Sequence, residues 1–162
     1  PVYFLRLSLK DSKQNEQSIN WYWLSKKPDE LDWKKSKWFY TPESGFADFT
    51  ALKGMPVSTL DIKYSTDKKE RHTTHSIIIT NTGKSVAFFV HVRALKEKNA
   101  DDILPVIFSD NYISLAPGES RTIECSYENS DAGGGMPYIL TTAWNLDVAG
   151  SKANGNAGFE KQ

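Results

Sequence analysis

The stretch from Val86 to Glu124 constrains the fold of this chain most, because it reads as short strands joined by tight turns with no helical segment between them. From Val86 to Leu95, apolar residues recur at every second position, the spacing that places side chains on one face of a strand. The predicted apolar face consists of Val86, Phe88, Val90, Val92 and Ala94, and the opposite face of Ala87, Phe89, His91, Arg93 and Leu95. The second face becomes polar along its length, which predicts a strand running from a covered into a solvated region.

Turn signals separate the other predicted strands. The Ala-Pro-Gly-Glu sequence at Ala116–Glu119 is typical of a tight turn, since Pro117 fixes φ and Gly118 tolerates a left-handed conformation. Asn81–Lys84 has similar turn chemistry. Short strands at this spacing predict an all-β fold, an immunoglobulin-like antiparallel β-sandwich over residues 55–148. The predicted strands are Val57–Tyr64, Thr73–Thr80, Val86–Leu95, Leu104–Phe108, Tyr112–Leu115, Ser120–Tyr127 and Tyr138–Asn145.

The rest of the chain divides into three segments. Residues 1–25 predict a hairpin with strands at Val2–Lys10 and Ile19–Ser25. Because an isolated hairpin is marginally stable in water, we expect it either to pair with the main sheets or to be the end of a preceding β-sandwich domain. Residues 26–54 lose all periodicity and predict an irregular connector. Residues 149–162 are rich in glycine, asparagine and lysine and predict a disordered tail.

Composition excludes several functional classes. The chain has 20 basic and 20 acidic residues, and a zero net charge argues against electrostatic binding of nucleic acid. Apolar runs such as Val86–Val90 are too short to predict a membrane span. The single cysteine, Cys125, excludes an intramolecular disulfide, and its alternation with Ile123 and Tyr127 predicts a small buried hydrophobe. The chain opens on Pro1 without a visible signal peptide, so we expect a fragment of a longer protein.

Candidate catalytic and metal-binding side chains do not form a convincing site. His72 and His75 are three residues apart, and this odd offset places them on opposite faces of a strand. His91 alternates with Val90 and Val92 within a predicted strand, so we expect it to be a surface histidine or one with hydrogen-bond partners. Glycoside hydrolysis needs two acids about 5–10 Å apart across a cleft. The acidic residues of this chain lie in sequences typical of turns or solvated charge clusters rather than of such a pair. They are Asp101, Asp102, Asp110 and Glu119. We therefore expect no catalytic, cofactor-binding or metal-binding residue in this chain.

Aromatic residues gather in the predicted connector. Trp33, Trp38 and Tyr40 lie among lysines in a segment without predicted regular structure. Exposed rings on loops can stack on sugar rings, which would make the segment a carbohydrate-binding surface. A long irregular segment can equally use its rings to pack against protein, which would make it an interdomain surface. Both interpretations remain open from the residues alone.

Several segments in collinear order resemble a known family. The chain is similar to glycoside hydrolase family 2, in the branch of exo-β-glucosaminidases and β-mannosidases that includes plant-type endo-β-mannosidases. The resemblance covers the end of one β-sandwich domain, a connector and the C-terminal immunoglobulin-like domain. The segments that carry it are Tyr3–Leu9, Trp21–Ser25, Ala47–Leu52, Val86–Val90, Ile103–Val106, Ser109–Tyr112 and Leu115–Ser120.

The resemblance implies a parent enzyme that cleaves β-linked mannose or glucosamine with retention, using two glutamates of a (β/α)₈ barrel upstream of Pro1. No residue of this chain matches that barrel, so the resemblance implies a non-catalytic accessory domain that needs no cofactor. Its implied partners are the other domains of the parent chain, and its implied location is periplasmic or secreted. The alternative is a carbohydrate-binding module that holds a β-linked oligosaccharide with its loop aromatics.

Overall fold

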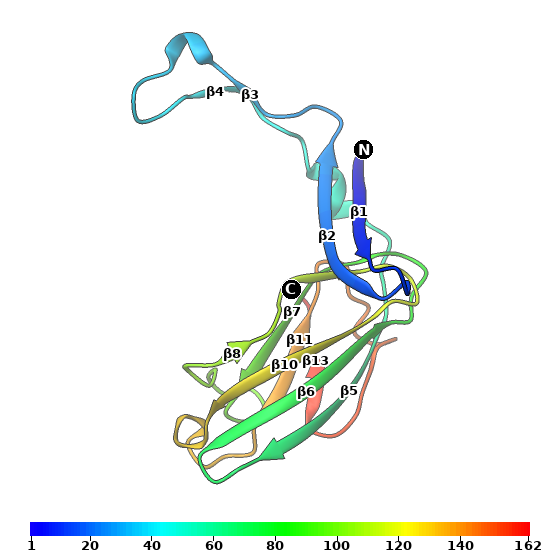
Figure 1. Cartoon of the computed structure of the whole chain (residues 1–162), viewed down its shortest axis with the longest axis vertical. Coiled ribbons are helices and arrows are strands. Elements are labelled where there is room, and N and C mark those ends of the chain that lie inside the picture. The colour runs from blue at the N-terminus through cyan, green and yellow to red at the C-terminus, as the bar shows by residue number, and fades with distance from the viewer. The chain divides into compact units, whose positions relative to one another are not determined.

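The computed structural model describes residues 1–162 and is built of strands and loops, with three short 3₁₀ turns at Trp33–Lys35, Thr50–Gly54 and Asn129–Ala132 (Figure 1). None of these turns has the length and apolar character needed to cross a membrane. The chain separates into two compact units, Pro1–Met55 and Pro56–Gln162.

The larger unit is an all-β sandwich, as predicted, whose two sheets pack face to face. One sheet has the order β12-β5-β6-β10-β8, with β12 at Lys152–Ala153, β5 at Leu60–Lys68, β6 at His72–Asn81, β10 at Ser120–Glu128 and β8 at Ile107–Phe108. The other has the order β13-β11-β7-β9, with β13 at Ala157–Phe159, β11 at Tyr138–Thr142, β7 at Ala87–Leu95 and β9 at Ile113–Leu115. All pairs are antiparallel except β12 with β5 and β13 with β11.

The core lies between the two sheets and follows from strict alternation along the strands. In β6 the buried positions are every second residue from Thr73 to Asn81, and they pair in register with β10. Branched and aromatic side chains suit such a half-buried pleated surface. The fully buried core side chains are Leu60, Ile62, Ile77, Ile79, Val90, Val92, Ile103, Leu115, Ile123, Cys125 and Ile139.

The predicted face assignment of β7 is wrong at its start. Ala87, Val90, Val92 and Ala94 belong to the core cluster, whereas Phe88 is buried outside it against the Trp144 ring, at a centroid distance of 6.5 Å. The pairing with β9 shifts register between Ala87 and Val90. This β-bulge inserts one residue, which inverts the alternation upstream of it.

The prediction of a disordered tail for residues 149–162 is also wrong. The tail adds β12 to one sheet and β13 to the other, and Ala153, Ala157 and Phe159 pack against the core. Two asparagines hold the tail against Tyr64 of β5. Asn154 Oδ1 accepts from the Tyr64 backbone N–H (3.1 Å), and the Asn156 backbone N–H donates to the Tyr64 hydroxyl (2.9 Å). The asparagines that suggested disorder therefore act as hydrogen-bonding partners of an open sheet edge.

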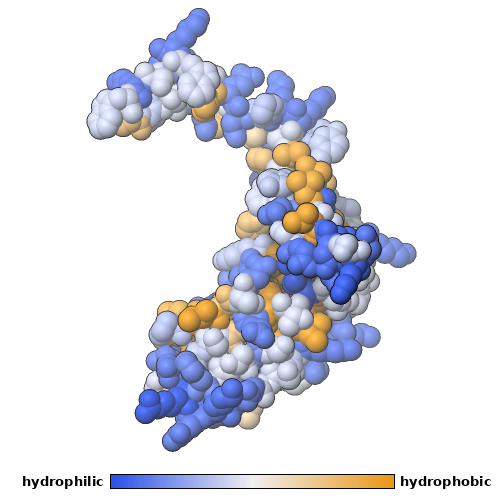
Figure 2. All heavy atoms as spheres, in the orientation of Figure 1, coloured by the Kyte–Doolittle hydropathy of each residue, from blue (hydrophilic) through white to orange (hydrophobic).

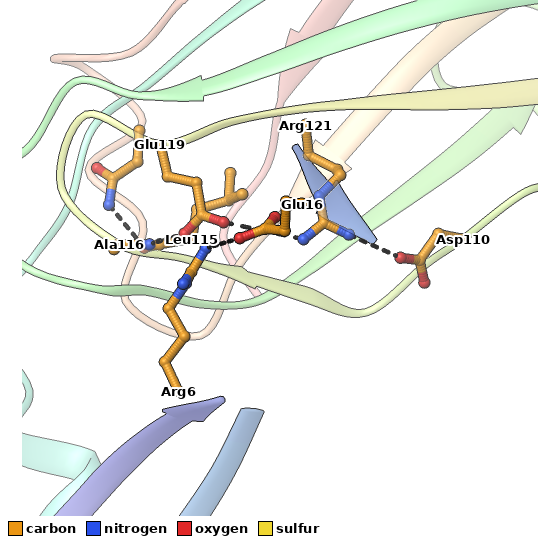
Figure 3. Close-up of polar contacts among 8 residues, drawn as sticks. Arg6, Glu16, Asp110, Leu115, Ala116, Glu119 and Arg121 are labelled. Carbon is orange, nitrogen blue, oxygen red and sulfur yellow. Dashed lines mark hydrogen bonds and ion pairs between the residues drawn. The ribbon is translucent and has the colours of Figure 1, made fainter. Parts of the chain in front are cut away.

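The smaller unit begins with the predicted hairpin. Strand β1 (Val2–Lys10) pairs antiparallel with β2 (Glu16–Ser25) in a two-stranded sheet that contains no other strand. An ion pair between Arg6 and Glu16 at 2.7 Å joins the two strands (Figure 3). The following connector is more regular than predicted, because β3 (Glu30–Leu31) pairs with β4 (Glu43–Gly45) and two of the 3₁₀ turns lie within it.

Candidate functional site

The three aromatic residues singled out from the sequence lie together on residues 30–45, which we call the arm. Its base is the β3–β4 pair, and the Asp32 backbone N–H extends the pairing by donating to the Pro42 carbonyl at 2.8 Å. Trp33, Trp38 and Tyr40 are all exposed, with 72%, 93% and 52% of their surface accessible. In Figure 2 the arm shows near-white, blue hydrophilic and a few orange hydrophobic residues intermixed.

The tip of the arm is a tight turn that displays two rings. The Lys37 N–H donates to the Tyr40 carbonyl (2.8 Å) and the Tyr40 N–H donates back to Lys37 (3.2 Å), so Trp38 and Phe39 occupy the turn positions. The Trp38 ring meets the edge of Phe39 at a centroid distance of 5.2 Å, and Phe39 lies 5.8 Å from Tyr40. A hydrogen bond of 2.7 Å between the hydroxyls of Ser36 and Thr41 braces the turn. Local hydrogen bonds thus hold the rings in place without burying them.

The 3₁₀ turn at Trp33–Lys35 carries the Trp33 ring. Asp32 precedes it as an N-cap, its side chain accepts from the Lys35 backbone N–H at 3.3 Å, and it also pairs with the Lys35 ammonium at 3.0 Å. Asp favours this position because its carboxylate satisfies an amide that has no helical partner. Trp33 follows this cap directly and is 72% exposed.

A second aromatic cluster, on the sandwich, was missed by sequence reasoning. The Tyr112 ring stacks on His91 with a centroid distance of 4.2 Å and an interplanar angle of 8°, and Phe89 meets Tyr112 at 5.6 Å. Asn111 fixes this arrangement by accepting from the Val92 N–H and donating to the Val92 carbonyl, both at 2.9 Å. Phe89 and Tyr112 have positive φ angles of 54° and 52°, which are uncommon for residues other than glycine. Neither residue type signals such a conformation, so the alternating pattern gave no warning of it.

The acidic residues form ion pairs that stabilise loops. Asp110 pairs with Arg121 at 3.4 Å, and Glu119 accepts from the Ala116 backbone N–H at 2.8 Å inside the predicted turn (Figure 3). Asp102, predicted as part of a solvated cluster, instead makes two hydrogen bonds of 2.9 Å to the Arg93 guanidinium. That contact raises the pKa of Arg93. These carboxylates are engaged by arginine or backbone partners, which is not the arrangement of an acid and a nucleophile across a cleft.

The two histidines His72 and His75 lie on opposite faces of β6, as predicted, with His72 exposed and His75 buried. The His75 ring nitrogens contact the Thr66 hydroxyl and the Tyr127 hydroxyl, each at 2.8 Å. Burial lowers the pKa of His75 and raises the pKa of Tyr127 to about 12. With both ring nitrogens occupied, His75 serves as a structural hydrogen-bonding residue.

Cys125 is fully buried beside this network, and burial raises the pKa of its thiol to about 12, as expected for a small core hydrophobe. No three side chains of histidine, cysteine, aspartate or glutamate approach closely enough to hold a metal ion. The structure therefore offers two aromatic surfaces, the arm and the Tyr112 cluster, as its candidate functional features.

Comparison with solved structures defines the class of the chain. An exo-chitosanase from Amycolatopsis orientalis, CsxA, superimposes with a TM-score of 0.82 at 34% identity, covering 90% of this chain and 17% of that protein. Together with the sandwich topology, this similarity places the chain among the immunoglobulin-like β-sandwich domains of glycoside hydrolases.

The family follows from sequence. Residues 38–146 match the model of the exo-β-D-glucosaminidase Ig-fold domain, and the chain belongs to this family. An exo-β-D-glucosaminidase of Streptomyces avermitilis is 40% identical over 148 residues, which are 89% of this chain and 16% of that protein. The exo-β-D-glucosaminidase of Amycolatopsis orientalis is 34% identical over 96% of this chain and 15% of that protein.

A plant relative shows the breadth of the likeness. A mannosylglycoprotein endo-β-mannosidase of Lilium longiflorum is 46% identical over 70 residues, or 40% of this chain and 7% of that protein. The predicted resemblance to the exo-β-glucosaminidase and β-mannosidase branch is confirmed. The chain spans only about one-sixth of the length of the glucosaminidases it matches.

Proposed function

We propose that this chain is a non-catalytic accessory region of a longer glycoside hydrolase of the exo-β-glucosaminidase type, and that its arm packs against the catalytic domain of the same polypeptide. The observation that carries the proposal is the arm itself, which is held by its own hydrogen bonds while Trp33, Trp38 and Phe39 stay between 65% and 93% exposed. Exposed rings at this density are typical of the centre of a protein interface. The small share of its relatives that the chain spans leaves ample protein to cover them.

The names of its relatives support a proposal for the substrate class of the longer protein. Two relatives that cover 89% and 96% of this chain are named as exo-β-D-glucosaminidases, whereas the endo-β-mannosidase covers 40%. We therefore favour terminal β-linked glucosamine over mannose as the sugar that the longer protein releases. The catalytic groups would lie outside these 162 residues.

The alternative is a carbohydrate-binding module that stacks sugars on the arm, and the same exposed rings support it. For this sugar class, charge favours protein packing over the carbohydrate-binding module. Glucosamine carries an amine that is protonated in neutral and acidic solution, while Lys34 and Lys37 flank the rings. Like charges disfavour that contact. Protein packing is therefore the better assignment for the arm.

Two measurements test the proposal. We expect the 162-residue chain to show no hydrolysis of nitrophenyl β-glucosaminide or β-mannoside, and saturable hydrolysis would refute its non-catalytic role. In the longer protein, Trp38→Ala combined with Phe39→Ala should lower the Tm, because both rings lose their partner surface. Met136→Ala, which truncates a side chain that is 71% exposed on the sandwich, is the matched control. NMR shifts at the arm on titration with glucosamine oligosaccharides would favour the binding module instead.

A further inference from the structure

The end of the arm, residues 33–41, which we now call the tip, includes the 3₁₀ turn and the tight turn and is cationic as well as aromatic. Residues 33–41 contain three lysines, Lys34, Lys35 and Lys37, and no acidic residue. Lys35 pairs with Asp32 at 3.0 Å, whereas Lys34 and Lys37 form no ion pair in the structure. This segment therefore carries two ammonium groups outside any ion pair, on Lys34 directly after Trp33 and on Lys37 directly before Trp38.

A partner for this tip must offer both apolar surface and negative charge. Trp38 and Phe39, exposed by 93% and 65%, have large areas to bury, and the lysines near them in sequence favour an acidic rim on the partner. The tight turn and the Ser36–Thr41 hydrogen bond hold the tip in one shape, which reduces the entropy lost on docking. These features suit a preformed surface that meets a concave acidic one.

The names of the relatives indicate the charge of the sugar that the longer protein binds. They are named for glucosamine, and one solved relative is a complex with PNP-β-D-glucosamine. Because the glucosamine amine is cationic, a cleft that binds it is expected to carry negative potential at its entrance. We infer that the arm tip docks at the rim of the glucosamine-binding cleft of the catalytic domain, with Lys34 and Lys37 facing carboxylates there. This inference rests on the proposed function and specifies the face to which the arm binds.

Proximity to the cleft has a kinetic consequence. Two ammonium groups at the rim repel a cationic substrate, so replacing them should strengthen substrate binding at low ionic strength. For charges about 10 Å apart across water, removing both should lower KM about two- to fourfold. Added salt screens the interaction, so the difference should disappear in about 1 M salt.

The test uses the full-length enzyme with the double substitution Lys34→Gln and Lys37→Gln. We expect KM for nitrophenyl β-glucosaminide to fall at low salt, with kcat unchanged and no difference at high salt. The matched control is Lys10→Gln with Lys13→Gln, which removes the same charge from exposed positions of the hairpin and should leave KM unchanged.

Cross-linking separates the inference from the proposed function. A carbodiimide activates a carboxylate, and a contacting lysine amine displaces the urea to form an amide. We expect Lys34 or Lys37 to be joined to a carboxylate of the catalytic domain. Such a cross-link without any change of KM would overturn the cleft-rim inference while leaving the packing proposal standing. If soluble reagents label Lys34, Lys37 and Trp38 readily in the full-length enzyme, that result would overturn the cleft-rim inference and the packing proposal.

Discussion

Replacing Asn81 with alanine should destabilise the sandwich strongly, because this one buried side chain connects three segments of the chain. Its Oδ1 accepts from the Ser58 hydroxyl at 2.7 Å and from the Gly83 backbone N–H at 2.9 Å. Its Nδ2 donates to the carbonyls of Ser85 at 2.8 Å and Leu115 at 2.9 Å. Asn81 is completely inaccessible to solvent, so no water replaces these partners without rearrangement.

The magnitude follows from those contacts. Each hydrogen bond contributes about 1 kcal/mol net, and a buried group left without a partner costs about 1–3 kcal/mol. The Ser58 hydroxyl keeps a second contact to the Ser85 carbonyl at 3.2 Å, which lowers the total. We expect a loss of about 3–5 kcal/mol in the free energy of unfolding, a large share of the roughly 5–15 kcal/mol of a typical domain.

Urea unfolding of the 162-residue chain measures this loss. With an m value of about 2 kcal/mol per M, the midpoint should fall by about 2 M while m stays constant. Ser58→Ala removes a smaller part of the network and should lower the free energy of unfolding by about 1 kcal/mol. This variant therefore tests the network even if Asn81→Ala does not fold. Asn20→Ala, at an exposed position of β2, should change the free energy by less than about 0.5 kcal/mol. A loss below about 1.5 kcal/mol for Asn81→Ala, with m unchanged, would refute the reasoning.

Three further predictions concern buried and newly ordered groups. Burial lowers the pKa of His75, so below about pH 6.5 the unfolded chain binds more protons than the folded one. The free energy of unfolding should therefore fall with falling pH by up to about 1.4 kcal/mol per pH unit. His75→Gln should reduce that slope, as measured by urea unfolding at several pH values. Because burial raises the pKa of the Cys125 thiol to about 12, it should react with a thiol reagent at pH 8 only as fast as the sandwich unfolds; prompt reaction under native conditions would contradict its burial. Phe159→Ala should cost about 1–3 kcal/mol in urea unfolding, since this half-buried ring packs on the core, whereas a disordered tail would lose nothing.

The sandwich was predictable because its signals are local. Alternation in β6 and β10, and the Ala-Pro-Gly-Glu turn with Gly118 at a φ of 77°, depend only on neighbouring residues. The start of β7 was assigned to the wrong face because Phe89, a residue that rarely adopts positive φ, forms the bulge. The tail was missed because its asparagines bond to Tyr64, about 90 residues away in sequence, and no local pattern reports such a contact.

The arm shows a different limit of sequence reasoning. The sequence predicted an irregular connector with Trp33, Trp38 and Tyr40 as a sugar-binding or interdomain surface, and the structure leaves all three rings exposed. Its small β3–β4 sheet escaped prediction, because strands of two and three residues have too few positions to show a period. A sandwich domain buries its apolar residues between its own sheets, so the alternation of those residues in the sequence predicts the fold. The arm leaves Trp33, Trp38 and Tyr40 exposed, so local patterns in its sequence do not show what covers these rings, and the proposed packing against the catalytic domain would supply that surface.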